Sequence, residues 1–491
     1  MPASAPSAVA APALAWRHDG DFASLGSAFY TRLAPTPLPA PHWVARCDDV
    51  AALLELPAGW LASDEALQIF SGNATAPGSQ PLASVYSGHQ FGVWAGQLGD
   101  GRALWLGETV QDQEVQLKGS GRTPYSRGAD GRAVLRSSIR EYLASHALHA
   151  LGIPTTRALC LVGSPQPVQR ETLETAAVVT RVAPSFIRFG HFEHFAARRQ
   201  TDELRRLADH VIERYYPQCQ SANNPYQTLL QTVGERTAQM LAHWQAAGFC
   251  HGVMNTDNMS ILGLTLDYGP FQFLDAFDPH HICNHSDRLG RYAFDRQPAV
   301  AYWNLLCLAR ALLPLIGTED DAQDALQTYE ASFESHYQVL MFAKLGLQGP
   351  PEEGDAALLW QLLHLLAAQQ VDWTLFWRSL SQSVADDDFT HARDLLVDRE
   401  GFDTWLPAYR GRIARSEQAG AAARMLRTNP RFALRNYMAE QAIDAARQGD
   451  FSVVHTLQTV LQHPFEERPD HADWAGLPPD WAHSIALSCS S

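Results

Sequence analysis

The strongest constraint on the fold comes from two short segments near the middle of the chain. Residues 251–258 read His-Gly-Val-Met-Asn-Thr-Asp-Asn, and the apolar run after them ends in Asp-Tyr-Gly at residues 267–269. Asn258 and Asp267 offer the oxygen atoms that a hard divalent cation bound to phosphates prefers. We expect them at neighbouring strand ends, with Asp257 as a nearby carboxylate for proton transfer. An Asx-turn that uses the same residues without a metal is the alternative.

A glycine-rich segment lies further upstream. Residues 96–102 read Gly-Gln-Leu-Gly-Asp-Gly-Arg, between two strands that we expect at residues 91–97 and 102–108. A tight Asp-Gly turn would join these strands into a hairpin. The missing side chains would also let backbone N–H groups approach a phosphate. Both interpretations stay open from this segment alone.

A lysine and a glutamate follow at positions that suit an ion pair. Residues 114–118 alternate so that Lys118 faces away from the side chains expected in the core. Apolar residues at helical spacing predict a helix over residues 135–151, and this helix contains Glu141. The pair would hold the ammonium group against the phosphates of a nucleotide, whereas a solvated lysine and an exposed glutamate are the alternative.

The order of these features is that of a protein-kinase-like site: glycine turn, strand lysine, helix glutamate, then an asparagine and an Asp-x-Gly. It predicts an α+β, bilobal fold with a small β-rich N-lobe that has one key helix and a large, mainly helical C-lobe. We expect four regions: residues 1–15 as a disordered tail, 16–80 as a wrapping segment, 81–184 as the N-lobe and 185–491 as the C-lobe with a helical extension.

Arginines are dense over residues 119–141, which reach into the expected helix. Arg122, Arg127, Arg132, Arg136 and Arg140 lie there, and Arg181 and Arg188 flank the expected crossing between lobes. Because guanidinium groups bind phosphates through paired donors, we interpret them as partners of a polyphosphate. Surface arginines paired with carboxylates are the alternative.

Composition excludes several other classes of protein. With 37 Lys and Arg against 53 Asp and Glu, the net charge of −16 argues against general affinity for nucleic acid or anionic membranes. No run approaches the roughly 18 uninterrupted apolar residues of a membrane span. The seven cysteines form no C-x-x-C pair, so their spacing indicates neither a zinc site nor a dense disulfide framework. We expect a cytoplasmic monomer without nucleic-acid or membrane partners.

Four strings resemble the selenoprotein O family, called YdiU in bacteria: residues 86–92, 116–127, 251–258 and 282–287. The resemblance extends from about Trp16 to the last residues. It implies a kinase-like fold that lacks the usual catalytic-loop aspartate, where this chain has Val253. It also implies transfer of AMP from ATP to Ser, Thr or Tyr hydroxyls of proteins, with pyrophosphate released. The nucleotide would bind flipped relative to kinases, with its α-phosphate facing the acceptor.

The resemblance also implies a role for particular residues. Lys118 and Glu141 would be the catalytic ion pair, and Asp257 would be the proton acceptor. Asn258 and Asp267 would hold Mg²⁺ or Mn²⁺. The residues that would contact ATP are Gly99, Gly101, Arg102, Lys118, Asp130, Gly131, Arg181, Arg188 and Asp267.

Two alternatives to this activity stay open. One is a protein or small-molecule kinase that uses Asp257 as a displaced base. The other is a nucleotide-binding pseudokinase without catalysis, which Val253 motivates.

The last residues suggest redox regulation. Many eukaryotic members of the family carry selenocysteine near this end, where the chain has Cys489. We hypothesise that Cys489 forms a regulatory disulfide with Cys283. Two free, inert thiols are the alternative.

Overall fold

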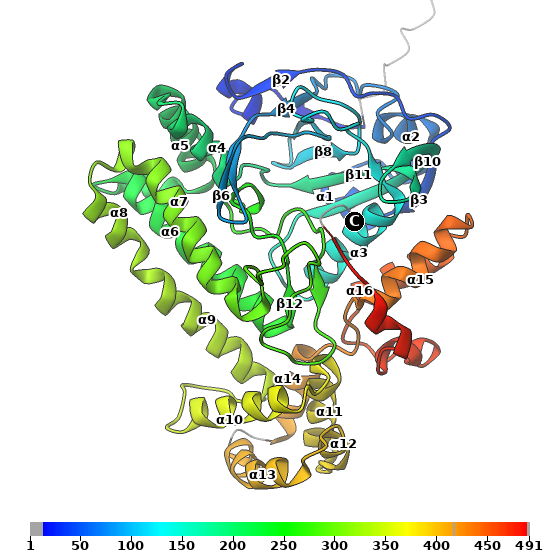
Figure 1. The fold of residues 1–491 in the computed structure, drawn as a ribbon, viewed down its shortest axis with the longest axis vertical. Helices are drawn as coiled ribbons and strands as arrows, with labels where there is room; N and C mark the ends of the chain where they lie inside the picture. The colour runs from blue at the N-terminus through cyan, green and yellow to red at the C-terminus, as the bar shows by residue number, and fades with distance from the viewer. Residues whose placement is uncertain (1–12, 416–417, 489–491) are drawn as a thin grey trace, which may run out of the picture.

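The computed structural model describes residues 13–415 and 418–488, which form a mixed α/β protein (Figure 1). Its large antiparallel sheet has the strand order β2 (Tyr30–Arg32), β4 (Leu82–Ser84), β7 (Ala103–Thr109), β8 (Glu114–Lys118), β11 (Leu173–Ala183), β10 (Arg157–Gln169) and β3 (His42–Arg46). β1 (Trp16–Arg17) pairs with β7, and β9 (Ala133–Val134) pairs with β11. The segment expected to wrap around the first lobe therefore supplies strands to the same sheet. Leu14, from the expected disordered tail, is buried, and residues 1–12 lie outside the described residues.

The two faces of the sheet are covered by different helices. Val115 and Leu117 of β8 pack in one apolar cluster with α1 (Asp48–Leu53) and α2 (Asp64–Phe70). The opposite face packs against α3 (Leu135–Ala150). Because side chains alternate along a strand, Lys118 lies on the α3 side. Arg181 of β11 lies on that side too, since its register partner is Gln116.

The prediction of a hairpin around residues 96–102 is wrong. β6 (Val93–Gln97) pairs with β5 (Ser87–Gln90) in a separate two-stranded sheet. The strands that pair with β7 are β8, β1 and β4, and β4 joins it at Leu82 and Trp105. Residues 98–102 continue as a loop, held by backbone bonds from Leu98 to Tyr86 and from Asp100 to Ser84. The sequence pattern indicated the strands, but it did not indicate that residues 82–84 would pair with β7.

Helices dominate the chain after the sheet. They are α4 (Phe189–Ala197), α5 (Thr201–Tyr215), α6 (Pro225–Ala247), α7 (Gln297–Ile316), α8 (Glu319–Leu326) and α9 (Thr328–Lys344). Asn224 caps the start of α6 with its side chain, and Gly248 ends the helix in the left-handed conformation. Between α6 and α7, β12 (Phe249–Cys250) pairs with β13 (Gln272–Phe273).

One helix passes a length and composition test for a membrane span. Within the described residues, Phe294–Ile316 has a mean hydropathy of 1.6, and 61% of the apolar window is buried inside the protein. Leu305, Leu308 and Leu312 of α7 belong to the main apolar core. A core helix of this kind is weak support for a membrane span.

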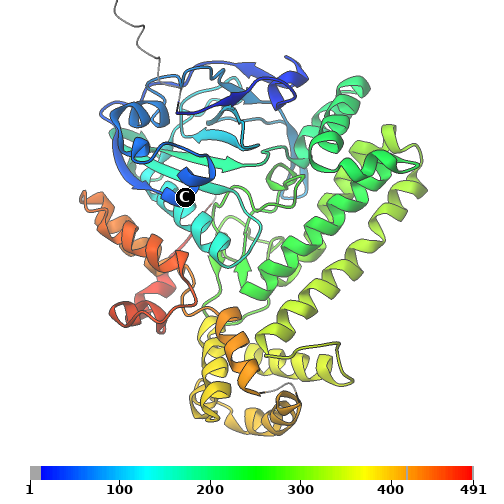
Figure 2. The ribbon, with the colours of Figure 1, turned by 180° about the vertical axis from the view of Figure 1, so that it is seen from behind.

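The remaining helices form two groups. α10 (Asp355–Ala368), α11 (Trp373–Asp386), α12 (Thr390–Asp394), α13 (Arg399–Ala414) and α14 (Gln418–Thr428) lie at the end of the molecule remote from the sheet (Figures 1 and 2). α15 (Asn436–Arg447) and α16 (Ser452–Gln462) return to the side of α3. There His455 Nε2 donates to Val44 O of β3 at 2.9 Å, which ties the end of the chain to its first third.

Candidate active site

Lys118 and Glu141 meet on the face of the sheet that packs against α3. Lys118 ends β8, Glu141 lies in α3, and Nζ is 2.6 Å from Oε2. Their side chains are 10% and 6% exposed, so the pair is shielded from bulk water. Strand alternation and the packing of α3 on this face bring the two residues together. Their part in catalysis stays a prediction.

Asp267 joins the same network from the loop between β12 and β13. Its backbone φ of 54° lies in the left-handed region, which Asp adopts more readily than bulkier residues. Asp267 Oδ1 is 2.9 Å from Lys118 Nζ and 2.5 Å from Arg181 Nη1. Arg188 Nη1 donates to the other oxygen, Oδ2. One carboxylate therefore accepts from three cations.

The network has more cations than carboxylates in direct contact. Burial alone would raise the pKa of Asp267, but Arg188, Lys118 and Arg181 lower it well below its ordinary value. Asp267 is therefore ionised. It shares Lys118 and Arg181 with Glu141, and it also pairs with Arg188. A buried cluster with more cations than carboxylates can attract phosphate groups.

Asp257 lies beside this network in the short 3₁₀ helix η4 (Thr256–Asn258). Its side chain is buried, Gln90 Nε2 donates to Oδ2 at 3.2 Å, and Oδ1 has no hydrogen-bond partner. Burial raises the pKa of Asp257 to about 6, although Arg188 and Gln90 oppose the rise. A carboxylate with this pKa and a free oxygen can accept a proton near neutral pH.

Asn258 and Asp267 do not lie at strand ends, and that expectation is wrong. Asn258 ends η4, and Asp267 lies in the loop before β13. Asn258 Nδ2 donates to Val253 O at 3.0 Å, which leaves Oδ1 as a neutral oxygen ligand. An ionised carboxylate and an amide oxygen form a hard donor set that fits Mg²⁺ or Mn²⁺. Both oxygens of Asp267 are engaged by cations in this structure, so a metal would have to displace some of these contacts.

The glycines upstream allow two loops to pack closely. Gly99 has a φ of 127°, and a Cβ there would lie 2.6 Å from Tyr125 Cγ. A Cβ on Gly101 would lie 2.9 Å from Tyr125 O, and one on Gly131 would lie 2.2 Å from the carbonyl carbon of Gly121. Gly99 and Gly101 thus let the loop of residues 98–102 pack against the loop of residues 119–132, and Gly131 lets the second loop pack against itself.

The charged residues of these loops lie nearer the surface. Arg102 is exposed, and Asp130 pairs with Arg170, whose Nη1 is 2.7 Å from Oδ2. The hydrogen bond from Arg170 lowers the pKa of Asp130. The network around Asp267 contains neither residue, and their contact with ATP stays a prediction.

Most of the clustered arginines have structural partners. Arg132 donates to Pro37 O at 2.6 Å, Arg136 lies 3.0 Å from Glu174, and Arg140 donates to Phe271 O at 2.8 Å. Among the arginines interpreted as phosphate partners, Arg181 and Arg188 are the two that reach Asp267.

Two glutamines support the site without having been predicted. Gln116 accepts from Arg181, and Gln90 donates to Asp257. Gln116 shares the face of Lys118 by strand alternation, so the pattern contained a signal for it. No local pattern identified Gln90, because its partner is remote in the sequence.

The C-terminal segment lies near Cys283. His285 N donates to Leu487 O at 2.7 Å, whereas Cys489 lies outside the described residues. Cys250 Sγ is 3.3 Å from Cys283 Sγ and is a second thiol within reach. The disulfide between Cys283 and Cys489 stays a prediction.

Comparison with known proteins gives the family. The model of the family described as "Protein adenylyltransferase SelO" matches residues 12–462. The chain is 61% identical to a "Protein nucleotidyltransferase YdiU" of Variovorax paradoxus, over 98% of each chain. It is 61% identical to the YdiU protein of Albidiferax ferrireducens over 97% of each chain. It is 55% identical to that of Burkholderia multivorans, over 96% of this chain and 95% of the relative. The chain therefore belongs to the SelO/YdiU family of protein nucleotidyltransferases.

Proposed function

We propose that this protein transfers AMP from ATP to Ser, Thr or Tyr hydroxyls of other proteins and releases pyrophosphate. The observation that carries the proposal is the buried network of Lys118, Arg181 and Arg188 beside an unpaired oxygen of Asp257. The network provides positive charge for the phosphates, and Asp257 provides a proton acceptor. Family membership supports nucleotidyl transfer to protein. We also propose that the sheet with α3 and the helical remainder form the two lobes of a kinase-like fold.

The contacts of Asp267 explain how nucleotide and metal binding would be coupled. Without nucleotide, this carboxylate accepts from Lys118, Arg181 and Arg188. Phosphate oxygens would replace it as the acceptor for these cations and would release Asp267 to join Asn258 as a metal ligand. Mg²⁺ or Mn²⁺, when bound there, would neutralise phosphate charge.

The proposed reaction uses one carboxylate as base and the cations as electrostatic support. The acceptor hydroxyl gives its proton to Asp257 Oδ1, and its oxygen bonds to the α-phosphorus. The bond from that phosphorus to the oxygen that bridges it to the β-phosphorus breaks, and this oxygen leaves with pyrophosphate. Lys118, positioned by Glu141, and the two arginines stabilise the charge that develops on the phosphate oxygens. Gly99, Gly101, Arg102, Asp130 and Gly131 would line the rest of the nucleotide site.

A kinase is the second candidate, because the Lys118–Glu141 pair also suits transfer of a γ-phosphoryl group. Incubation of the purified full chain with ATP labelled separately at the α and γ positions distinguishes the two. Acid-stable protein label from the α position and none from the γ position is the expected result.

Three variants complete the experiment. Asp257→Asn should lower α labelling by about 10²-fold to 10⁴-fold. Asp267→Asn should abolish it, while Asp444→Asn, on the exposed surface of α15, should retain it. Label from γ alone would replace the proposal with a kinase. Absence of both labels, together with a rise in melting temperature on addition of ATP, would indicate a nucleotide-binding scaffold without catalysis.

A further inference from the structure

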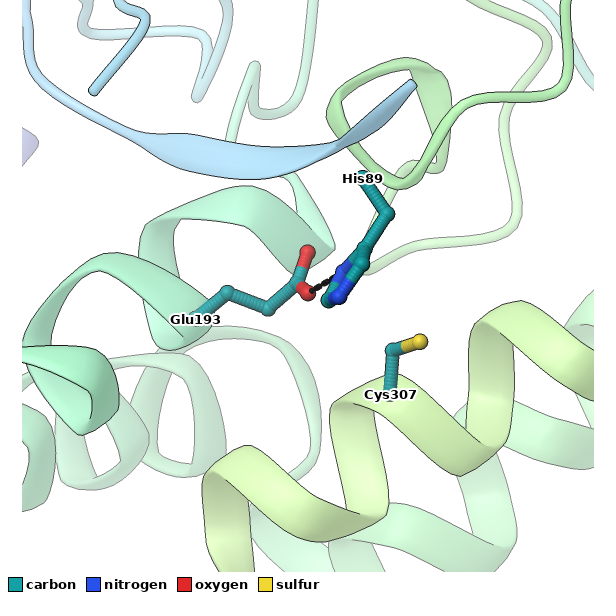
Figure 3. Close-up of side chains that lie close together, drawn as sticks. All are labelled: His89, Glu193 and Cys307. Carbon is teal, nitrogen blue, oxygen red and sulfur yellow. Dashed lines mark hydrogen bonds and ion pairs between the residues drawn. The ribbon is translucent and has the colours of Figure 1, made fainter. Parts of the chain in front are cut away.

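A second cluster of chemically active side chains lies close to Asp257 but outside the network around Asp267. It consists of His89 from β5, Glu193 from α4 and Cys307 from α7, which converge in Figure 3. One ligand atom from each residue lies within 4.8 Å of the other two. His89 Nδ1 is 2.6 Å from Glu193 Oε1. The proposed reaction uses none of the three.

The surroundings of the cluster leave one of its oxygens without a partner. Glu193 is 4% exposed, and its second oxygen, Oε2, is buried without a hydrogen bond. Burial raises the pKa of Glu193, and the hydroxyl of Thr256 opposes that rise without giving Oε2 a hydrogen bond. A buried carboxylate oxygen left in this way is costly. A simple His–Glu ion pair therefore does not account for the whole cluster.

We propose that His89, Glu193 and Cys307 bind a zinc ion, with water as the fourth ligand. Imidazole, carboxylate and thiolate are the ligands that zinc accepts in tetrahedral sites, and three protein ligands leave one position open. The thiolate separates this site from the oxygen-only set at Asn258 and Asp267, which suits harder cations.

Binding would release the thiol proton of Cys307 to solvent, because zinc binds the thiolate. Burial raises the pKa of Cys307 to about 12, so the ion must displace a firmly held proton. Arg291 and Arg310 lie near Cys307 and partly offset this rise by favouring the thiolate. The affinity for zinc should therefore increase with pH.

The site would also hold the loop that carries the proposed base. His89 N donates to Thr256 Oγ1 at 2.8 Å, and Thr256 is the residue before Asp257. An ion bound to β5, α4 and α7 would help to fix the position of this loop. The zinc proposal rests on the positions of His89, Glu193 and Cys307 and does not depend on which group is transferred from ATP.

Zinc binding can be measured directly on the full chain. The protein is stripped with a chelator and titrated with Zn²⁺ against a chromophoric competitor in excess Mg²⁺. One tightly bound zinc per chain is expected, and Cys307→Ser and Glu193→Gln should each weaken binding by more than about tenfold. Cobalt substitution should give a thiolate charge-transfer band that Cys307→Ser lacks.

Two matched variants control for the loss of a buried thiol. Cys219→Ser removes a buried cysteine outside the cluster. Cys250→Ser removes the buried thiol that contacts Cys283. Both should bind zinc as the unaltered protein does. If Cys307→Ser fails to fold, alkylation of the unaltered protein still tests the site, since zinc should protect Cys307 in peptide mapping. Absence of tight zinc binding, unchanged binding by folded Cys307→Ser, or protection confined to other cysteines would overturn the proposal.

Discussion

Replacing Asp257 by asparagine should make the protein more stable at neutral pH while removing its activity. The substitution keeps the size of the side chain and an oxygen that accepts from Gln90, but it removes the charge. In the metal-free and nucleotide-free protein, burial raises the pKa of Asp257 from 3.8 to about 6. The folded state therefore holds this proton more tightly than the unfolded state.

The sign and size of the effect follow from that difference. Between about pH 4 and pH 6 the unfolded chain loses the proton first, so the free energy of unfolding of the unaltered protein falls as pH rises. The rise in pKa from 3.8 to about 6 corresponds to about 3 kcal/mol of unfolding free energy. The unaltered protein has lost all of this stabilisation above pH 6. Asp257→Asn escapes this loss. It should melt about 3 °C higher at pH 7 and show little difference at pH 4.

Thermal unfolding at a series of pH values, with chelator and without nucleotide, measures the effect. α-Label transfer on the same samples should fall by about 10²-fold to 10⁴-fold because the base is lost. Asp130→Asn is the control with the opposite sign. Because folding lowers the pKa of Asp130, this variant should become less stable than the unaltered protein as pH rises. An Asp257→Asn variant no more stable at pH 7 than at pH 4, relative to the unaltered protein, would refute the assigned burial cost.

Three further results are expected. Asp267→Asn should destabilise the nucleotide-free protein by about 3 to 5 kcal/mol, since three buried cations lose their shared partner. Added pyrophosphate should restore part of the melting temperature. An unchanged free energy of unfolding would contradict the network. Burial lowers the pKa of Lys344 to about 7 beside Trp373 and Trp377, so Lys344→Met should raise stability below pH 7, and this gain should shrink toward pH 10 in a pH series of denaturant titrations. A persistent gain at pH 10 would point to packing instead of charge. Non-reducing peptide mapping after mild oxidation should find Cys283 joined to Cys489, and both thiols free would refute that hypothesis.

Local patterns predicted the parts of the site that lie on regular elements. Alternation in β8 placed Lys118 opposite the core side chains, and helical spacing placed Glu141 in α3. These patterns are visible because strand and helix periods are fixed by backbone geometry. They failed for the expected hairpin, because β6 pairs with β5, whereas β7 pairs with β8, β1 and β4. Pairing of strands depends on distant segments that no local period encodes.

The sequence by itself determined the family, the order of the site residues and the two ends of α6, which Asn224 and Gly248 cap. Tertiary structure decided that Asp267 gathers three cations and that Asp257 keeps an unpaired oxygen. The cysteine spacing gave no sign of zinc, yet folding places Cys307 beside two residues more than a hundred positions upstream. Hydrogen bonding and burial depend on which segments pack together, so the charge state of a side chain is a property of the folded chain.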